Sequence, residues 1–154
     1  MNKFFKYDYK FCNLFIAEKS GAISNVLFKK DKLPDGFIKG ETPLIKKAAK
    51  QLDEYFNGKR KRFDLPLLLT GTAFQVKVWK ALQDIPYGES RSYGEIAAIT
   101  GNKKASRAVG MANNRNPIAI IVPCHRVIGH DGSLTGYAGG LEIKENLLRI
   151  EKII

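Results

Sequence analysis

Short apolar runs separated by polar turns fill the first part of the chain. Aromatic and β-branched residues dominate Phe4–Phe28, a composition that β-strands favour. Two of these runs, Leu14–Ala17 and Ile23–Phe28, flank Ser20-Gly21, a pair typical of tight turns. The pattern predicts a hairpin or small antiparallel meander.

A helical period follows Lys29–Gly40, a polar stretch that we expect to be a loop. Thr42 can cap the helix, and Pro43 suits its first position. The lysines of this helix are interpreted as a solvated face. Apolar residues recur at helical spacing up to Gly58, namely Ile45, Ala48, Ala49, Leu52, Tyr55 and Phe56.

The character of the sequence changes near Thr70-Gly71, where we place a domain boundary. Before it, Phe63–Leu69 is expected to form one more strand. After it, Thr72 is predicted to cap a helix that runs to Ile85. The sequence thus predicts an N-terminal domain over residues 1–70 and a C-terminal domain over residues 71–154.

Two short helices joined by a glycine-containing turn come next. Ser92 and Glu95 have the spacing of a capping box, and the helix they open ends at Gly101. Asn102 is expected to cap a second helix over Lys103–Asn113. The pair is typical of a helix-turn-helix, although helical hairpins in enzymes give a similar pattern.

The rest of the chain predicts one strand and one helix. The apolar run Ile118–Val122 predicts a buried strand that ends at Pro123. The final helix is expected over Leu141–Ile153, with Leu141, Leu147, Leu148 and Ile150 facing inward. The predicted fold class is α/β (α+β): a small N-terminal domain with an antiparallel sheet and a helix, and a mostly helical C-terminal domain with a helix-turn-helix and a short central strand.

The net charge of the chain indicates what kind of partner it binds. The 154 residues carry a formal net charge of +11. Such an excess points to a polyanion. No apolar run is long enough for a membrane helix and no signal peptide is evident, so we expect a cytoplasmic protein with no membrane partner. No Asp or Glu lies between Glu95 and Asp131, a stretch that contains Lys103, Lys104, Arg107, Arg115 and Arg126.

The candidate chemistry follows the predicted strand directly. Cys124 stands at its end and is followed at once by His125 and Arg126. The thiolate is the nucleophilic form of cysteine, and a neighbouring base raises its reactivity. Cys124 is therefore the candidate nucleophile, with an inert buried cysteine as the competing interpretation. Cys12, the other cysteine, lies in different surroundings, and both are expected to be reduced.

Several segments, in order, resemble one protein family. Pro123-Cys124-His125-Arg126-Val127 follows Asn116-Pro117 and precedes Gly136-Tyr137-Ala138-Gly139-Gly140-Leu141. Together with Phe74–Trp79, Tyr93–Ala97 and Arg107-Ala108-Val109-Gly110, they resemble the O6-alkylguanine-DNA alkyltransferases, or methylated-DNA–protein-cysteine methyltransferases. The similarity covers roughly Thr72–Glu151, whereas the N-terminal third fits only by length and coarse pattern.

This resemblance implies direct reversal of DNA damage. The protein would bind double-stranded DNA through the minor groove, rotate an O6-alkylguanine out of the stack and move the alkyl group onto Cys124. A damaged base costs less to extract than a well-paired one. The thioether is stable, so each molecule, acting as a monomer with no cofactor and no metal, would react once. Activity on O4-alkylthymine is left open.

The resemblance also implies individual roles. His125 would accept the thiol proton by way of a water, Glu151 would orient the imidazole, and Asn116 would act as a hinge. Arg107 would fill the gap left by the flipped nucleotide, and Tyr93 would crowd the target phosphate and donate to the base. The base pocket would be lined by Tyr137, Ala138, Gly139, Gly140 and Val127, with the Cys124 and Val127 carbonyls accepting from the guanine amine. The basic stretch and the small residues of the second short helix, rather than the resemblance, give the candidate DNA-binding positions: Lys104, Ser106, Ala108, Gly110, Arg115 and Arg126.

Two other functions remain open on the sequence alone. One is a lesion or DNA binder without catalysis, in which Cys124 is structural. The other is a cysteine hydrolase built on Cys124 and His125, but adjacent residues of an extended chain point to opposite sides, so their contact would need a turn. The individual residues have plainer interpretations too: a core histidine at His125, a solvated carboxylate at Glu151 and a phosphate contact at Arg107.

Overall fold

The computed structural model describes residues 2–154, which divide into two compact units. The first unit contains the chain up to Thr70 together with Pro117–Ile121. The second contains Gly71–Asn116 and Val122–Ile154. The candidate chemistry at Cys124 and its neighbours therefore belongs to the second unit.

A sheet with strand order β3-β2-β1-β4 forms the centre of the first unit. The antiparallel strands are β1 (Lys3–Asp8), β2 (Asn13–Lys19) and β3 (Ala22–Leu27). The predicted hairpin is confirmed, and its two turn residues have positive φ, 54° at Ser20 and 77° at Gly21. A turn with both central residues at positive φ matches the twist of the flanking strands.

The polar stretch Lys29–Gly40 contains more structure than the predicted loop. It includes the short 3-10 helix η1 (Lys30–Lys32) and the strand β4 (Ile38–Lys39), which pairs in parallel with β1. A two-residue edge strand has too little apolar alternation to be visible as a sequence pattern.

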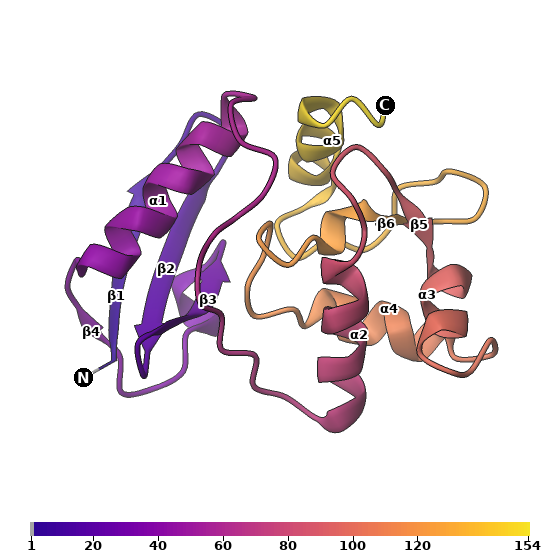
Figure 1. The fold of residues 1–154 in the computed structure, drawn as a ribbon, viewed down its shortest axis with the longest axis horizontal. Coiled ribbons are helices and arrows are strands. Elements are labelled where there is room, and N and C mark those ends of the chain that lie inside the picture. The colour runs from indigo at the N-terminus through magenta and orange to yellow at the C-terminus, as the bar shows by residue number, and fades with distance from the viewer. Residues whose placement is uncertain (1) are drawn as a thin grey trace. The chain divides into compact units, whose positions relative to one another are not determined.

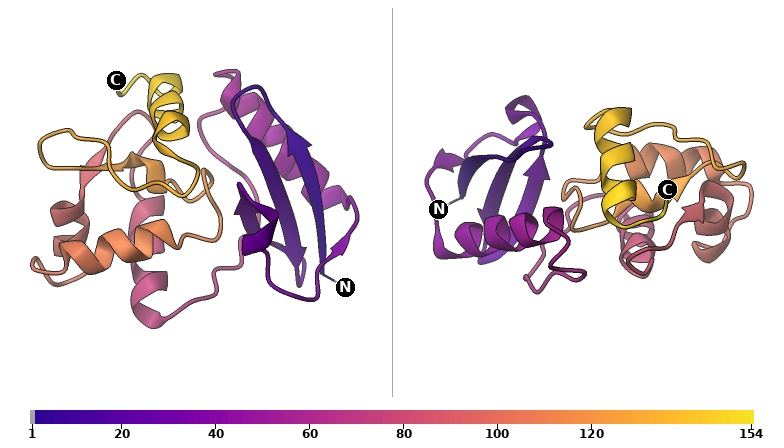
Figure 2. Two further views of the ribbon diagram at one scale, coloured as in Figure 1. Left: turned by 180° about the vertical axis from the view of Figure 1, so that it is seen from behind. Right: turned by 90° about the horizontal axis from the view of Figure 1, so that it is seen from above.

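Helix α1 (Pro43–Phe56) lies along one face of this sheet (Figures 1 and 2). It begins as predicted, because the Thr42 side chain accepts a hydrogen bond from the Ile45 N–H at 3.1 Å and Pro43 occupies the first turn. Its predicted apolar positions are all buried, which places the core of the first unit between α1 and the sheet.

Two apolar runs that predicted strands do not form regular ones, and those predictions were wrong. In Phe63–Leu69 only Leu67 bridges a strand residue, Ile23. In Ile118–Val122 every side chain is buried, yet the backbone turns at Ile120, where φ is 72°. A left-handed residue cannot continue an extended ladder. The apolar run thus correctly predicted that these residues are buried, but it did not predict the conformation of their backbone.

The second unit is mostly helical (Figure 1). A two-stranded parallel sheet pairs β5 (Arg91–Ser92) with β6 (Val127–Ile128), and the 3-10 turn η2 (Cys124–Arg126) leads directly into β6. The short strand predicted for this domain therefore lies after Cys124 instead of before it. Its helices are α2 (Ala73–Gln83), α3 (Tyr93–Ile99), α4 (Ser106–Asn114) and α5 (Leu141–Ile150).

The predicted caps of α2 and α3 are confirmed as reciprocal capping boxes, Thr72 with Gln75 and Ser92 with Glu95. The buried Trp79 joins α2 to α4, because its Nε1–H donates to the Ala112 carbonyl at 2.9 Å. α3 packs directly against α4. Their description as a helix-turn-helix stays a prediction.

The ends of two helices differ from the predicted ones. α4 begins at Ser106, because Asn102 and Ala105 close a separate turn in which the Ala105 N–H donates to the Asn102 carbonyl at 3.0 Å. α5 ends at Ile150 instead of Ile153, and Leu141, predicted to face inward, is 50% exposed. Within residues 2–154, no helix combines the length and hydrophobicity that crossing a membrane requires.

Candidate active site

Cys124 is buried at the first position of η2, and backbone contacts hold it on both sides. Its own N–H donates to the Val122 carbonyl at 2.8 Å. The Asn116 amide donates to the same Val122 carbonyl at 2.7 Å, and the Asn113 amide donates to the Cys124 carbonyl at 3.2 Å. The end of α4 and the residues after it thus fix the backbone that carries the thiol.

A buried carboxylate gathers the side chains that follow Cys124. His125 Nε2 lies 2.6 Å from Glu151 Oε2, and both side chains are fully buried. The Gly88 N–H donates to Glu151 Oε1 at 3.0 Å. Because a carboxylate accepts hydrogen bonds, Nε2 is assigned as the protonated nitrogen, which leaves Nδ1 as the nitrogen able to accept a proton.

Arg126 completes this network and does not reach outward, so its predicted role in DNA binding was wrong. Its Nε and Nη2 donate to Glu151 at 2.8 and 3.2 Å, and its Nη1 donates to the Ile85 carbonyl at 2.6 Å. The residue is only 6% exposed and its guanidinium also lies over the Tyr87 ring. The cation therefore compensates Glu151 and leaves no surface for a phosphate.

Burial dominates the ionisation of the two central groups. It raises the pKa of the Cys124 thiol, while the Asn116 hydrogen bond, the charge of Lys144 and the Tyr137 hydrogen bond oppose that rise. Burial lowers the pKa of His125, and the Glu151 contact opposes that change only in part. At neutral pH the site therefore holds a thiol and a neutral imidazole, which is a base ready to take a proton.

The side chains of Asn113 and Lys144 belong to this site, and neither was predicted from the sequence. The fully buried Lys144 Nζ donates to the Val127 carbonyl at 2.7 Å and to the Thr135 carbonyl at 2.9 Å. Its burial lowers its pKa to about 8. A signal for Lys144 existed, because it stands three residues from both Leu141 and Leu147 on the predicted apolar face of α5. Asn113 gave no comparable signal.

Tyr93 and Arg107, which are predicted to act on the flipped nucleotide, line one hollow of about 450 Å³. The Tyr93 hydroxyl donates to the Thr135 carbonyl at 3.1 Å, the same carbonyl that Lys144 contacts. Arg107 is exposed at the rim. The hollow is lined by Tyr93, Ser106, Arg107, Gly110, Met111, Asn114, Thr135 and Gly136.

The glycine-rich loop leads from this hollow into α5. Tyr137 is half-buried, and its carbonyl accepts from the Gly140 N–H at 3.0 Å. Gly140 stands just before α5 with φ 97°, a conformation that glycine adopts without strain. Ala138 is exposed, Gly139 is half-buried, and Val127 is fully buried.

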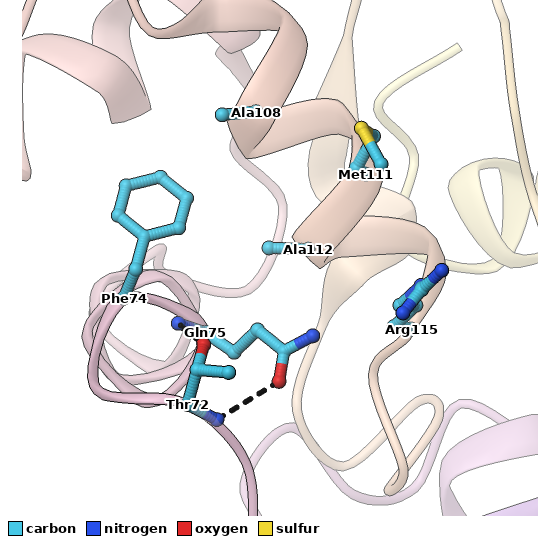
Figure 3. A pocket seen from close by; sticks show the side chains of 7 residues that line it. All are labelled: Thr72, Phe74, Gln75, Ala108, Met111, Ala112 and Arg115. Carbon is cyan, nitrogen blue, oxygen red and sulfur yellow. Dashed lines mark hydrogen bonds between the residues drawn. The ribbon is translucent and has the colours of Figure 1, made fainter.

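A second hollow of about 210 Å³ separates the start of α2 from α4 (Figure 3). Phe74 and Gln75 face it from α2, and the Gln75 side chain accepts from the Thr72 N–H at 3.0 Å. Met111 lines both hollows. The predicted DNA-binding residues Ala108 and Arg115 line this second hollow, and Lys104 is exposed before α4.

The charged and sulfur-bearing side chains do not form a metal centre in the described part of the chain. Residues 2–154 contain no cluster of three His, Cys, Asp or Glu side chains suited to a metal ion. Both cysteines are free thiols. The arrangement of Cys124, His125 and Glu151 instead has the order of a nucleophile, a base and an orienting carboxylate.

Comparison with known proteins supports this geometry. Residues 3–69 match the family model described as 6-O-methylguanine DNA methyltransferase, ribonuclease-like domain, and residues 73–153 match the DNA binding domain of the same name. A methylated-DNA–protein-cysteine methyltransferase of Methanosarcina acetivorans is 61% identical over 80% of this chain and 78% of its own. The constitutive Bacillus subtilis protein of that name is 62% identical over 73% of this chain and 69% of its own.

Solved structures agree with the sequence relatives. The Mycobacterium tuberculosis O6-methylguanine methyltransferase superimposes with a TM-score of 0.90 at 45% identity, covering 99% of this chain and 93% of that one. The M. tuberculosis OGT in complex with DNA gives a TM-score of 0.90 at 46% identity, covering 97% and 92%. The resemblance seen in the sequence is confirmed, and the chain belongs to the 6-O-methylguanine DNA methyltransferase family.

Proposed function

We propose that this protein repairs O6-alkylguanine in double-stranded DNA by moving the alkyl group irreversibly onto Sγ of Cys124. One observation carries the proposal: a buried thiol is followed on a 3-10 turn by a histidine that contacts a buried carboxylate at 2.6 Å. Cys124 and His125 are consecutive residues of that turn, which supports the proposal that they act together. Family membership supplies the substrate class.

The transfer balances as a displacement at the alkyl carbon. The Cys124 thiol gives its proton to neutral His125, by way of a water, and Sγ attacks the carbon. A sulfur–carbon bond forms, the bond from carbon to guanine O6 breaks, and its electron pair stays with the base. The base takes a proton back and becomes ordinary guanine. The thioether has no comparable leaving group, so one molecule acts once.

The hollow bounded by Tyr93, Arg107 and Thr135 is the entrance for the flipped nucleotide. Arg107 is exposed there and can fill the vacated space in the duplex, while Tyr93 is fixed through Thr135 beside the opening. The helix-turn-helix of α3 and α4 presents the small residues Ser106, Ala108 and Gly110 to the minor groove. Lys104 and Arg115 then contact phosphates without reading sequence.

Within the pocket, the backbone provides the recognition. The carbonyls of Cys124 and Val127 accept from the guanine amine, and Tyr137 with residues 138–140 encloses the base. Asn116 links the end of α4 to the reactive segment through Val122. The transfer needs a reduced thiol, which favours action in the cytoplasm. All these residues belong to one chain, so a monomer suffices.

The test is stoichiometric labelling. Duplex DNA with O6-methylguanine labelled in its methyl group is incubated with the protein, and the modified peptide is located by mass spectrometry. We expect at most one methyl per chain, on the peptide that contains Cys124. Cys124→Ser should abolish transfer and keep DNA binding, whereas the matched control Cys12→Ser should transfer normally.

The other outcomes separate the competing functions. DNA binding by the unmodified protein without transfer would identify a lesion binder. Continuous release of labelled methanol would identify a hydrolase. Either result would contradict the proposal.

A further inference from the structure

Asn113 carries a buried hydrogen-bond acceptor that no described residue satisfies. The residue lies near the end of α4 and is 2% exposed. Its Nδ2 donates to the Cys124 carbonyl at 3.2 Å, which fixes the orientation of the amide. Its Oδ1 is fully buried and accepts no hydrogen bond from residues 2–154. Such orphaned acceptors are rare in native proteins because burying one is unfavourable.

The location of this oxygen suggests what satisfies it. Oδ1 shares one amide group with Nδ2, so it is held beside the Cys124 carbonyl. The neighbouring carbonyl in the proposed base pocket, Val127, already accepts from the Lys144 ammonium at 2.7 Å. The Cys124 carbonyl likewise already accepts from Asn113. Of these three acceptors, Asn113 Oδ1 is therefore the one that accepts no hydrogen bond from residues 2–154.

We propose that Asn113 is a specificity-determining residue whose Oδ1 accepts a hydrogen bond from the 2-amino group of the flipped guanine. The inference rests on the proposed function and names a side chain that selects the base. A guanine amine has two N–H groups. One can donate to the Val127 carbonyl, and the other can be shared between the Cys124 carbonyl and Asn113 Oδ1, because the Asn113 amide contacts that carbonyl. A base without that amine leaves Oδ1 unsatisfied in the complex as well.

A hydrogen bond from the 2-amino group to Asn113 predicts the relative rates at which related lesions react. O6-methylhypoxanthine has the same reacting atoms as O6-methylguanine but lacks the 2-amino group. O4-methylthymine has a carbonyl oxygen in place of that amine. This oxygen would face Asn113 Oδ1, and two hydrogen-bond acceptors cannot bond to each other. Both should react more slowly than O6-methylguanine, and the hypoxanthine lesion isolates the single missing group.

The experiment compares single-turnover methyl transfer from O6-methylguanine and O6-methylhypoxanthine in the same duplex context. The wild-type protein should prefer guanine. In Asn113→Leu that preference should fall roughly three- to tenfold, the range for one neutral hydrogen bond. Differences in base pairing belong to the DNA and cancel between the variants, and a general loss of stability slows both lesions together.

A second variant separates base recognition from the tether to Cys124. Asn113→Asp keeps an acceptor oxygen but has no amide to donate to the Cys124 carbonyl. It should transfer more slowly from both lesions and still prefer guanine. Loss of the preference in Asn113→Asp as well as in Asn113→Leu would show that Asn113 acts only as a tether, and would overturn the inference.

The wild-type protein gives a test that needs no variant. Equal rates on the two lesions overturn the role of Asn113 while leaving the proposed function intact. Absence of methyl transfer to Cys124 from O6-methylguanine overturns the proposed function itself.

Discussion

Replacing Glu151 by glutamine tests whether this carboxylate both stabilises the fold through Arg126 and orients His125 for methyl transfer. In the wild-type protein its oxygens, which are buried, accept from His125, from Arg126 twice and from the Gly88 N–H. Glutamine has nearly the same shape, so it leaves no cavity. It removes the negative charge and offers an N–H group where only acceptors are useful.

The expected loss of stability follows from the buried cation. Arg126 is 6% exposed and Glu151 is its only carboxylate partner among the contacts described above. Removing one member of a buried ion pair costs about 3–5 kcal/mol of unfolding free energy. Since glutamine keeps one acceptor oxygen, we expect about 3 kcal/mol, which for a chain of this size lowers the melting temperature by roughly 6–12 °C.

The expected loss of activity has a different origin. Without the carboxylate, His125 is no longer held with Nε2 protonated and Nδ1 able to accept a proton. Positioned acid–base groups contribute roughly 10²–10⁴ in rate, so single-turnover methyl transfer should slow by a factor in that range. The two losses can be separated because only the first depends on the Arg126 charge.

The double variant Glu151→Gln with Arg126→Met makes that separation. With both charges removed, the unfolding free energy should recover by at least about 1 kcal/mol, because neutral replacement of a buried pair is often close to neutral. Methyl transfer should remain slow. Urea unfolding can be followed by Trp79, the only tryptophan, which is 2% exposed in the same unit as the site. Recovery of wild-type transfer in the double variant would refute the orienting role of Glu151.

Three further perturbations address other parts of the site. Arg107→Ala should slow repair in duplex DNA by at least about tenfold but affect the free modified base much less, because only the duplex requires an extruded nucleotide; equal losses on both would contradict the role. The unfolding free energy should fall as the pH drops below about 6.5, because the pKa of His125 is lowered in the folded state and the unfolded chain takes up that proton first; urea titrations between pH 5 and 8 should show this slope and lose it in His125→Gln. Lys144→Met removes a charge that lowers the pKa of Cys124, so the rise of the transfer rate with pH should move to higher pH, and an unchanged profile would count against the electrostatic contribution of Lys144.

Features of the fold that depend only on residues close in the sequence could be predicted from it. The caps at Thr42, Thr72 and Ser92 were predicted because each involves groups three residues apart. The run Ile118–Val122 was assigned to a strand because five apolar residues in a row indicate burial and cannot specify φ. Pairing with a distant residue also shapes this run, because Val26 bridges Ile118 two residues before the turn at Ile120.

The same distinction applies to the site. Cys124 and His125 are adjacent, so their chemistry could be proposed from sequence, and Glu151 followed from the family resemblance. Arg126 was misassigned because a positive charge in a basic segment looks the same whether it faces DNA or a buried carboxylate 25 residues away. Only folding reveals that partner. Lys144 could have been found by asking why a lysine interrupts the apolar face of α5.

The buried hydrogen-bond network around Cys124 explains how a thiol that is proposed to react only once can stay unreactive until its substrate binds. Arg126 neutralises Glu151 and, with Lys144 and the lack of solvent, keeps His125 uncharged at rest. The thiol stays protonated because burial raises its pKa, so it is a poor nucleophile toward stray electrophiles. In the proposed mechanism, reaction then requires an alkyl carbon held against Sγ while His125 takes the proton. Because both conditions are met only by a base seated in the pocket, selectivity depends as much on the resting protonation states as on the shape of the site.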